Sequence, residues 1–164
     1  MTTRMIIIVD FGSQTTHLIG RRIRELGVSA KIIHPEETLS EIKKQKPHGV
    51  ILSGGPSSVY EKNAPAINKE IFSLGIPILG ICYGLQLPAH LLGGKVVAGK
   101  REYGPVTLKL STINYQLSTK LPKQFTVWMS HGDEVVKLPK GFEVFGSTEH
   151  VPFAMAGDLK RNIY

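Results

Sequence analysis

Short apolar runs alternate with amphipathic stretches along the first ninety residues of the chain. Four runs rich in β-branched or aliphatic residues have the length of buried strands, and they cover residues 5–9, 28–33, 49–52 and 76–81. Strands that alternate with helices are typical of βαβ units. The pattern therefore predicts an α/β fold with an open, mostly parallel, twisted sheet that is flanked by helices.

The stretches between these runs are predicted helices. The sequence T-L-S-E, which begins at Thr38, has the form of a capping box with Glu41 at the third helical position, and Pro47 ends that helix. Two other segments carry apolar residues at helical spacing and end before a glycine, namely Leu18–Leu26 and Ala66–Leu74.

The pattern changes after Gly94, where short apolar runs are separated by turn residues. These runs are VVAG, PVTLKL, FTVWMS, FEVFGS and PFAMAG. They predict a second half that is richer in strands, some of them antiparallel. The chain contains no repeat, linker or low-complexity tract, so we expect residues 1–164 to form one domain.

The composition of the chain indicates in which cellular compartment the protein resides. The chain is 41% hydrophobic and 20% charged, which is ordinary for a globular protein. No apolar run approaches the roughly 20 residues of a membrane span, so we expect no membrane insertion. A single cysteine, Cys82, cannot form an internal disulfide, and the apolar N-terminal run lacks a signal-peptide cleavage site. These features predict a cytoplasmic protein.

The formal net charge of +7 raises the question of nucleic-acid binding. The basic clusters, residues 21–24 and 43–46, fall on predicted helices and lack interleaved aromatic residues or a known binding motif. We interpret them as solvated helix faces and expect no nucleic-acid partner. The charge also suits attraction of an anionic partner or substrate.

Cys82 lies in the sequence GICYG, directly after the fourth predicted strand. A G-x-C-x-G frame between a strand and a helix is the cysteine counterpart of the serine nucleophile elbow. The N-terminus of the following helix favours the thiolate, so we expect a lowered pKa for Cys82. The alternative is that Cys82 is a small buried hydrophobic residue, but the two glycines favour a nucleophile.

A nucleophile that attacks an acyl group needs hydrogen-bond donors for the developing oxyanion. The backbone N–H of Tyr83 can supply one, and Gly55 in the SGGP sequence at residues 53–56 can supply another. SGGPSS can also be an ordinary loop. It is not the S-G-G-x-D-S loop of ATP pyrophosphatases, because Pro56 and Ser57 follow the glycines and no aspartate does.

GICYGLQ together with SGGP resembles the class I glutamine amidotransferases, which release ammonia from glutamine. The sequences at 6–27, KREYG at 100–104 and VWMSHGDEV at 127–135 are similar to the GMP synthase branch of that family. The resemblance covers nearly the whole chain and implies a flavodoxin-like fold.

The resemblance implies roles for individual residues. Cys82 would attack the carboxamide of glutamine, and the N–H groups of Gly55 and Tyr83 would hold the oxyanion. Further residues would bind the substrate, namely Gly54, Pro56, Gln86, Ser130, Gly132 and Asp133. Without the resemblance, Gln86 could be a solvated helix residue and SHGD an ordinary turn.

The resemblance also implies partners. It predicts no cofactor and no metal in this domain, whereas ATP and Mg would bind to a GMP synthetase ATP-pyrophosphatase domain or subunit that receives the ammonia. Any oligomer would form through that synthetase part.

The family takes its catalytic base from a late H-P-E tripeptide. The one HPE here, His34–Glu36, precedes the cysteine and suits a strand-to-helix turn, so we do not assign it. His131 would be a substrate-side residue, and His150 would lie near the rim of the site. RNIY at 161–164 resembles the start of the strand that leads to the family tripeptide, so we expect the C-terminal end to be missing and the chain to be inactive alone.

Three points stay open from the sequence. Pro88 predicts an irregular turn in the helix after Cys82, which affects the placement of Gln86. The chain could instead be the glutaminase of another biosynthetic amidotransferase. It could also be a catalytically incomplete docking or regulatory module.

Overall fold

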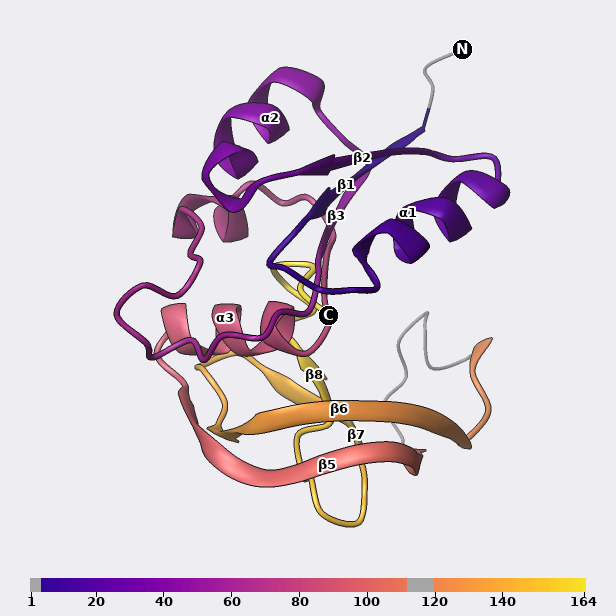
Figure 1. The fold of residues 1–164 in the computed structure, drawn as a ribbon, viewed down its shortest axis with the longest axis vertical. Helices are drawn as coiled ribbons and strands as arrows, with labels where there is room; N and C mark the ends of the chain where they lie inside the picture. The colour runs from indigo at the N-terminus through magenta and orange to yellow at the C-terminus, as the bar shows by residue number, and fades with distance from the viewer. Residues whose placement is uncertain (1–3, 112–119) are drawn as a thin grey trace.

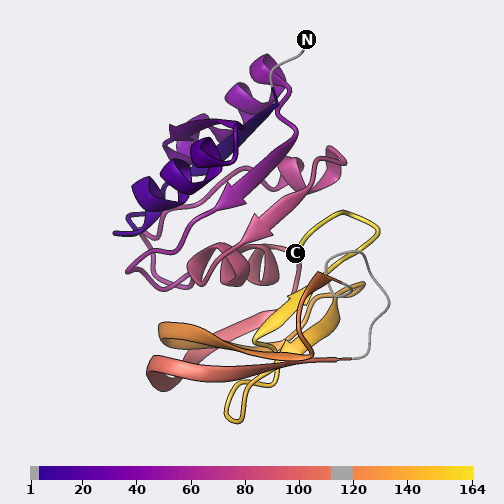
Figure 2. The ribbon, with the colours of Figure 1, turned by 90° about the vertical axis from the view of Figure 1, so that its right-hand side faces the viewer.

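Two four-stranded sheets form the molecule, with a helix between them. The computed structural model describes residues 4–111 and 120–164, and the side chains of Lys100 and Arg101 lie outside the described set. One sheet has the order β2-β1-β3-β4 and the other the order β6-β5-β7-β8. Helix α3 (Tyr83–Leu91) lies between the two sheets (Figures 1 and 2).

The first sheet is parallel throughout and confirms the predicted strands. Strand β1 (Met5–Val9) lies between β2 (Ser29–Ile33) and β3 (Gly49–Leu52), and β3 pairs with β4 (Ile78–Gly80). At the outer edge of β4, the Tyr164 N–H donates to Ile78 O and the Gly80 N–H donates to Tyr164 O, both at 2.8 Å. The last described residues therefore extend the parallel sheet beside the strand that leads to Cys82.

Helices α1 (Thr16–Glu25) and α2 (Thr38–Gln45) form where the sequence predicts them, but the predicted capping box is wrong. Thr38 is already helical, and its hydroxyl donates to Pro35 O at 2.7 Å. The capping pair is instead His34 and Glu37, on the short 3-10 helix η1 (Pro35–Glu37).

The predicted helix over 66–74 is a shorter 3-10 helix, η2 (Lys69–Ser73). Its start is fixed by Asn68, whose side-chain oxygen accepts a hydrogen bond from the Glu70 N–H at 2.9 Å. The two preceding residues therefore lie outside the helix, since an N-cap side chain marks where the helical turn begins.

Helix α1 packs through small residues rather than through its leucines. Leu18 and Leu26 are 49% and 82% exposed, whereas Thr16 and Gly20 are buried. A Cβ on Gly20 would lie 3.4 Å from Ile8 and 3.6 Å from Ile32, so the helix approaches β1 and β2 closely along its glycine face.

The second half is antiparallel, as its short apolar runs predict. Strands β5 (Lys95–Leu110) and β6 (Gln124–Lys137) form a long pair, and β7 (Glu143–Ser147) and β8 (Met155–Gly157) complete the sheet. The SHGD sequence belongs to β6 and is not a turn.

A shift in register interrupts the long pair beside SHGD. Ala98 pairs with Asp133, and the next pair is Glu102 with His131. Three residues of β5 thus face the single residue Gly132 of β6, which is a bulge that re-aims the neighbouring side chains.

One buried cluster joins the two sheets. It includes Ile7 and Val9 of β1, Leu87 of α3, and Val96 and Val135 of the antiparallel pair. This continuity is compatible with a single domain over 1–164, which stays a prediction. Among the described residues, no helix has both the length and the apolar character to cross a membrane.

Candidate active site

Cys82 occupies the sharp turn between β4 and α3. Its backbone has φ 51° and ψ −112°, a conformation that non-glycine residues rarely adopt. Such strain persists only where the surrounding structure imposes it, and it is concentrated at functional sites. The turn therefore has the backbone form of a nucleophile elbow.

The two glycines of the GICYG frame permit this turn because side chains would not fit there. A Cβ on Gly80 would lie 2.3 Å from Gly84 O, and a Cβ on Gly84 would lie 2.1 Å from Leu52 O. Helix α3 therefore starts directly against the ends of β3 and β4. The sequence frame predicts this elbow correctly.

The SGGP loop lies beside the elbow. A Cβ on Gly54 would lie 3.6 Å from the Cβ of Cys82. Gly55 has no room for a side chain, since a Cβ there would lie 2.5 Å from Phe11 O. The loop is fixed by the fully buried Ser53, whose hydroxyl accepts from the Phe11 N–H and donates to Gly54 O.

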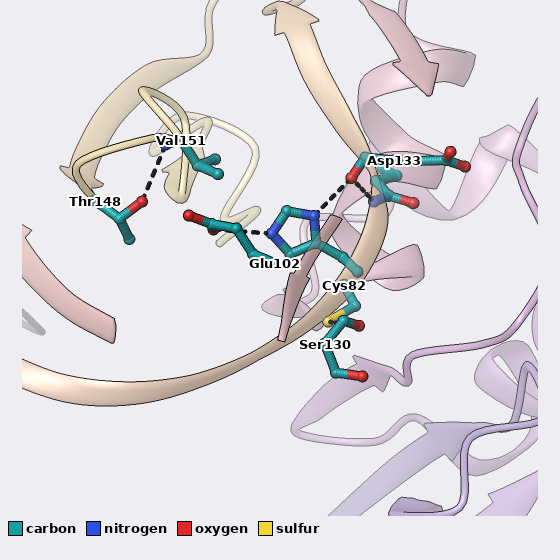
Figure 3. A network of polar contacts seen from close by, with 8 residues as sticks. Cys82, Glu102, Ser130, Asp133, Thr148 and Val151 are labelled. Atoms are coloured by element: carbon teal, nitrogen blue, oxygen red, sulfur yellow. Dashed lines mark hydrogen bonds and ion pairs between the residues drawn. The ribbon is translucent and has the colours of Figure 1, made fainter. Parts of the chain in front are cut away.

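The thiol of Cys82 is partly buried and faces β6. Its Sγ lies 4.0 Å from Ser130 O, as Figure 3 shows. Burial raises the pKa of Cys82, which is opposite to the lowering expected from the helix N-terminus. Desolvation disfavours the charged form, so the resting thiol keeps its proton. Among the described residues, no histidine or carboxylate is hydrogen-bonded to this sulfur.

The side chain of Tyr83 points away from the reaction site into the core. Its ring lies 5.1 Å from that of Phe11, and its hydroxyl donates to Pro65 O. Burial and the negative charge of Glu61 raise its pKa to about 12. The phenol is therefore a neutral structural donor, and only the backbone N–H of Tyr83 is free for an oxyanion role.

Four segments of the chain meet around one polar cavity of about 640 Å³. All the predicted site residues except Gly54 line it, and Gly54 lies directly behind Cys82. The lining residues predicted from the sequence are Gly55, Pro56, Cys82, Tyr83, Gln86, Ser130, Gly132 and Asp133. The structure thus brings together residues that are up to 78 positions apart, from Gly55 to Asp133.

Pro88 does not disturb this arrangement. Helix α3 continues through it to Leu91, and the Leu92 N–H donates to Pro88 O at 3.0 Å. The predicted irregular turn is therefore absent. Gln86 is buried, and its side-chain amide donates to Asp133 O at 3.0 Å.

Sequence reasoning missed Tyr60. Its hydroxyl donates to Asp133 Oδ1 at 3.0 Å, although the two residues are 73 positions apart. Tyr60 lies in an irregular loop without a motif, so nothing local in the sequence marks it. Through Tyr60 and Gln86, both the side chain and the carbonyl of Asp133 are held in place.

A smaller, apolar cavity of about 250 Å³ borders Cys82 on its other side. It is lined by Leu85, Val127, Met129 and Phe153, among others. Cys82 thus lies between a polar and an apolar cavity.

The histidines differ in how they lie relative to Cys82. His34–Glu36 follows β2, at the opposite edge of the parallel sheet from β4, so this HPE sequence is too remote to serve Cys82. His150 is exposed and lines neither of the two cavities that border Cys82. His131 borders both of them.

Comparison with known proteins agrees with this geometry. The profile of the family described as Glutamine amidotransferase class-I matches residues 7–164. The chain belongs to the class I glutamine amidotransferase family. Its elbow, SGGP loop and polar cavity are therefore interpreted as parts of an amidotransferase glutaminase site.

Among relatives of this amidotransferase chain, a protein named GMP synthase (glutamine-hydrolyzing) from Aquifex aeolicus is 50% identical over 165 residues, which cover 100% of the chain and 32% of the relative. A protein of the same name from Campylobacter lari is 51% identical over 160 residues, with coverage of 97% and 31%. The chain thus spans about a third of these relatives.

Solved structures show the same fold. A protein from Thermoplasma acidophilum that is described as part of a GMP synthase has a TM-score of 0.82 and 32% identity, covering 99% of this chain and 81% of that one. A glutamine amidotransferase from Thermotoga maritima has a TM-score of 0.78 at 22% identity, covering 98% and 73%. These neighbours confirm the predicted fold class.

The described residues offer no obvious metal site. No three His, Cys, Asp or Glu side chains gather closely enough among them to hold an ion. The expectation that this domain needs neither metal nor cofactor stays a prediction.

Proposed function

We propose that this chain is the glutaminase part of a GMP synthase, in which Cys82 hydrolyses glutamine and the released ammonia aminates XMP. The observation that carries the proposal is the convergence of the strained cysteine elbow, the SGGP loop and the Ser130–Asp133 segment on one polar cavity. The relatives at about 50% identity that carry the name GMP synthase support the choice among amidotransferases.

The proposed first step is attack by the Cys82 sulfur on the side-chain amide carbon of glutamine. A C–S bond forms, and the C=O electron pair moves onto oxygen, where the N–H groups of Gly55 and Tyr83 stabilise it. The pair then returns, the C–N bond breaks, and the nitrogen leaves as ammonia after it takes up a proton. Water hydrolyses the thioester to glutamate and regenerates the thiol.

The remaining predicted residues would bind the substrate. Gln86, Ser130, Gly132 and Asp133 line the same cavity as Pro56 of the SGGP loop, and Gly54 lies next to Cys82. The donors and acceptors of this part of the cavity wall suit the amino and carboxylate ends of an amino acid. Tyr60 would contribute indirectly by holding the Asp133 side chain.

We also propose that the 164 residues by themselves hydrolyse glutamine slowly. Burial raises the pKa of Cys82, and no histidine or carboxylate among the described residues is hydrogen-bonded to its sulfur. A thiol in this state needs a base to become a nucleophile. A His–Glu pair of the kind that the family uses would supply it.

The amination of XMP would be carried out by a synthetase domain or subunit that binds ATP and Mg. This chain spans about a third of the relatives named GMP synthase, which leaves room in them for such a part. The oligomeric contacts would be those of the synthetase part, and the protein would work in the cytoplasm.

The test compares ammonia release and XMP amination by two proteins. One is the 164-residue chain, and the other is a fusion that joins it to the part of the Aquifex aeolicus relative that this chain does not span. We expect glutamine-dependent amination only in the longer protein, and loss of that activity in its Cys82→Ser variant with amination from added ammonia retained. Equal glutaminase rates in the two proteins would overturn the slow-hydrolysis proposal. Amination of XMP that is indifferent to glutamine would overturn the functional assignment.

A further inference from the structure

A buried histidine–glutamate pair borders the polar cavity through its histidine. Glu102 of β5 and His131 of β6 face each other across the strand pair, with 3.3 Å between Glu102 Oε2 and His131 Nε2. Their side chains are only 8% and 10% exposed. The pair arises from the bulge in β5, since the three residues after Ala98 face only Gly132 and bring Glu102 opposite His131.

The other ring nitrogen of His131 contacts the substrate wall. Its Nδ1 lies 3.0 Å from Asp133 O, the same carbonyl that accepts from the Gln86 side-chain amide. Figure 3 shows Glu102 and Asp133 on opposite sides of the ring, with Ser130 next to Cys82 below it. A continuous series of polar contacts therefore runs from Glu102 through His131 to Asp133 and Gln86.

The hydrogen bonds determine which ring nitrogen carries a proton. Asp133 O can only accept, so Nδ1 must be the donor there, and a neutral ring then has a bare Nε2. Glu102 satisfies that nitrogen either as a carboxylate beside a doubly protonated ring or as a carboxylic acid that donates to it. Without Glu102, Nε2 loses its partner, and the contact with Asp133 O is then the one described hydrogen bond that favours a proton on Nδ1.

The surroundings of Glu102 indicate a functional rather than a structural role. Among the described residues, its Oε1 atom is buried and has no hydrogen-bond partner. A buried, unpartnered carboxylate oxygen is costly, so a glutamate is a poor choice here for stability alone.

We propose that Glu102 is a positioning residue of the glutamine site. It fixes the Nδ1–H form of His131, and His131 in turn holds the Asp133 carbonyl and the Ser130–Asp133 wall opposite Cys82. This inference rests on the proposed glutaminase function for the identity of the ligand, but the link from Glu102 to Gln86 does not depend on that function.

The first test therefore uses the ligand-free chain. The measurement is a ¹⁵N–¹H NMR spectrum, in which the side-chain amide signals of Gln86 are to be assigned by comparison with Gln86→Glu. We expect Glu102→Leu to move these signals toward the position of a solvated glutamine amide. Glu102→Gln should leave them in place, because the Gln amide can donate to Nε2. The matched control is Glu143→Leu, which replaces an exposed glutamate on β7. An unmoved Gln86 signal in Glu102→Leu would overturn the proposal.

The second test measures glutamine binding as protection of Cys82 from iodoacetamide. We expect Glu102→Leu to raise the half-protecting glutamine concentration about tenfold, equivalent to about 1.4 kcal/mol, and Glu102→Gln to restore most of the loss. In a His131→Leu background, the Glu102→Leu change should not raise the half-protecting glutamine concentration further, because Glu102 acts on the site through His131. An equal, additive loss in that background would show a generally structural role and contradict the proposal. If glutamine protects no variant while the Gln86 signal still moves, the positioning link stands and the proposed substrate is wrong.

Discussion

Gly84 lies so close to Leu52 that a Cβ on the glycine would be 2.1 Å from the Leu52 carbonyl oxygen. The start of α3 is thus seated on the end of β3, and this contact sets the direction from which Cys82 leaves β4. At the other glycine of the frame, a Cβ on Gly80 would lie 2.3 Å from Gly84 O in the same helix turn. These two close approaches accompany the strained backbone conformation of Cys82.

Gly84→Ala should therefore destabilise the protein and disturb the elbow. The new methyl group would meet backbone atoms, which cannot move aside as a side chain can. We expect a loss of about 3 kcal/mol in the free energy of unfolding, measured by urea denaturation. The control is Gly20→Ala in α1, where the new Cβ would be 3.3 Å from the movable end of Arg24. Similar losses for both variants would contradict the special role of Gly84.

Ser53→Ala should weaken the SGGP loop. The hydroxyl of Ser53 bonds to the Phe11 N–H at 3.0 Å and to Gly54 O at 2.9 Å in a fully buried position. Its removal leaves two buried backbone groups without a partner, at a cost of about 1–3 kcal/mol. Ser40→Ala is the control, because the hydroxyl of Ser40 is exposed and water can replace it. Thermal unfolding that shows no difference between the two variants would count against this role for Ser53.

The reactivity of Cys82 should depend on pH in a defined direction. Only the thiolate reacts with iodoacetamide, and burial raises the pKa of this thiol, so less thiolate exists at a given pH in the folded chain. We expect the alkylation rate of the native chain to rise at higher pH than that of the urea-unfolded chain, whose midpoint should be near about 8.5. Because Cys82 is the only cysteine, the measurement reports on a single site. A native profile displaced to lower pH would contradict the raised pKa and favour the helix N-terminus as the dominant influence.

Tyr60→Phe should reduce glutamine binding without a large effect on stability. The variant removes the hydrogen bond to Asp133 Oδ1, and the side chain is half exposed in the folded chain. We expect the half-protecting glutamine concentration to rise about threefold to tenfold, which corresponds to the loss of an ordinary hydrogen bond worth about 0.5–1.5 kcal/mol. Tyr103→Phe is a matched control, since Tyr103 borders the same cavity and its hydroxyl has no hydrogen bond to the rest of the described chain. If both variants raised the half-protecting glutamine concentration equally, the hydrogen bond from Tyr60 to Asp133 would not explain the effect.

The features that the sequence predicts well are those that depend on neighbouring residues. The GICYG frame contains the whole elbow, because the strand, the turn and the glycines that allow it are consecutive. The parallel strands are similarly marked by continuous apolar runs, which are typical of strands covered on both faces. The T-L-S-E sequence led to a wrong prediction of a capping box at Thr38. Residues 34–37 before it already form a capped turn, in which the Glu37 carboxylate accepts a hydrogen bond from the His34 N–H.

The features that sequence reasoning missed depend on long-range packing. The Glu102–His131 pair exists only because a bulge shifts the register of β5 against β6, and no local pattern reveals that bulge. The bond from Tyr60 to Asp133 joins a loop to a strand across the cavity. The direction of the Cys82 pKa shift follows from how closely the antiparallel sheet covers the sulfur, which the helix start alone does not indicate.

The most direct test of the account is labelling of Cys82 by the chloroketone analogue of glutamine, located by peptide mass spectrometry. We expect modification of Cys82 that slows as free glutamine is added and is unaffected by asparagine, whose side chain is one methylene shorter. Labelling at the same rate with and without saturating glutamine would contradict the claim that this cysteine lies in a glutamine-binding site.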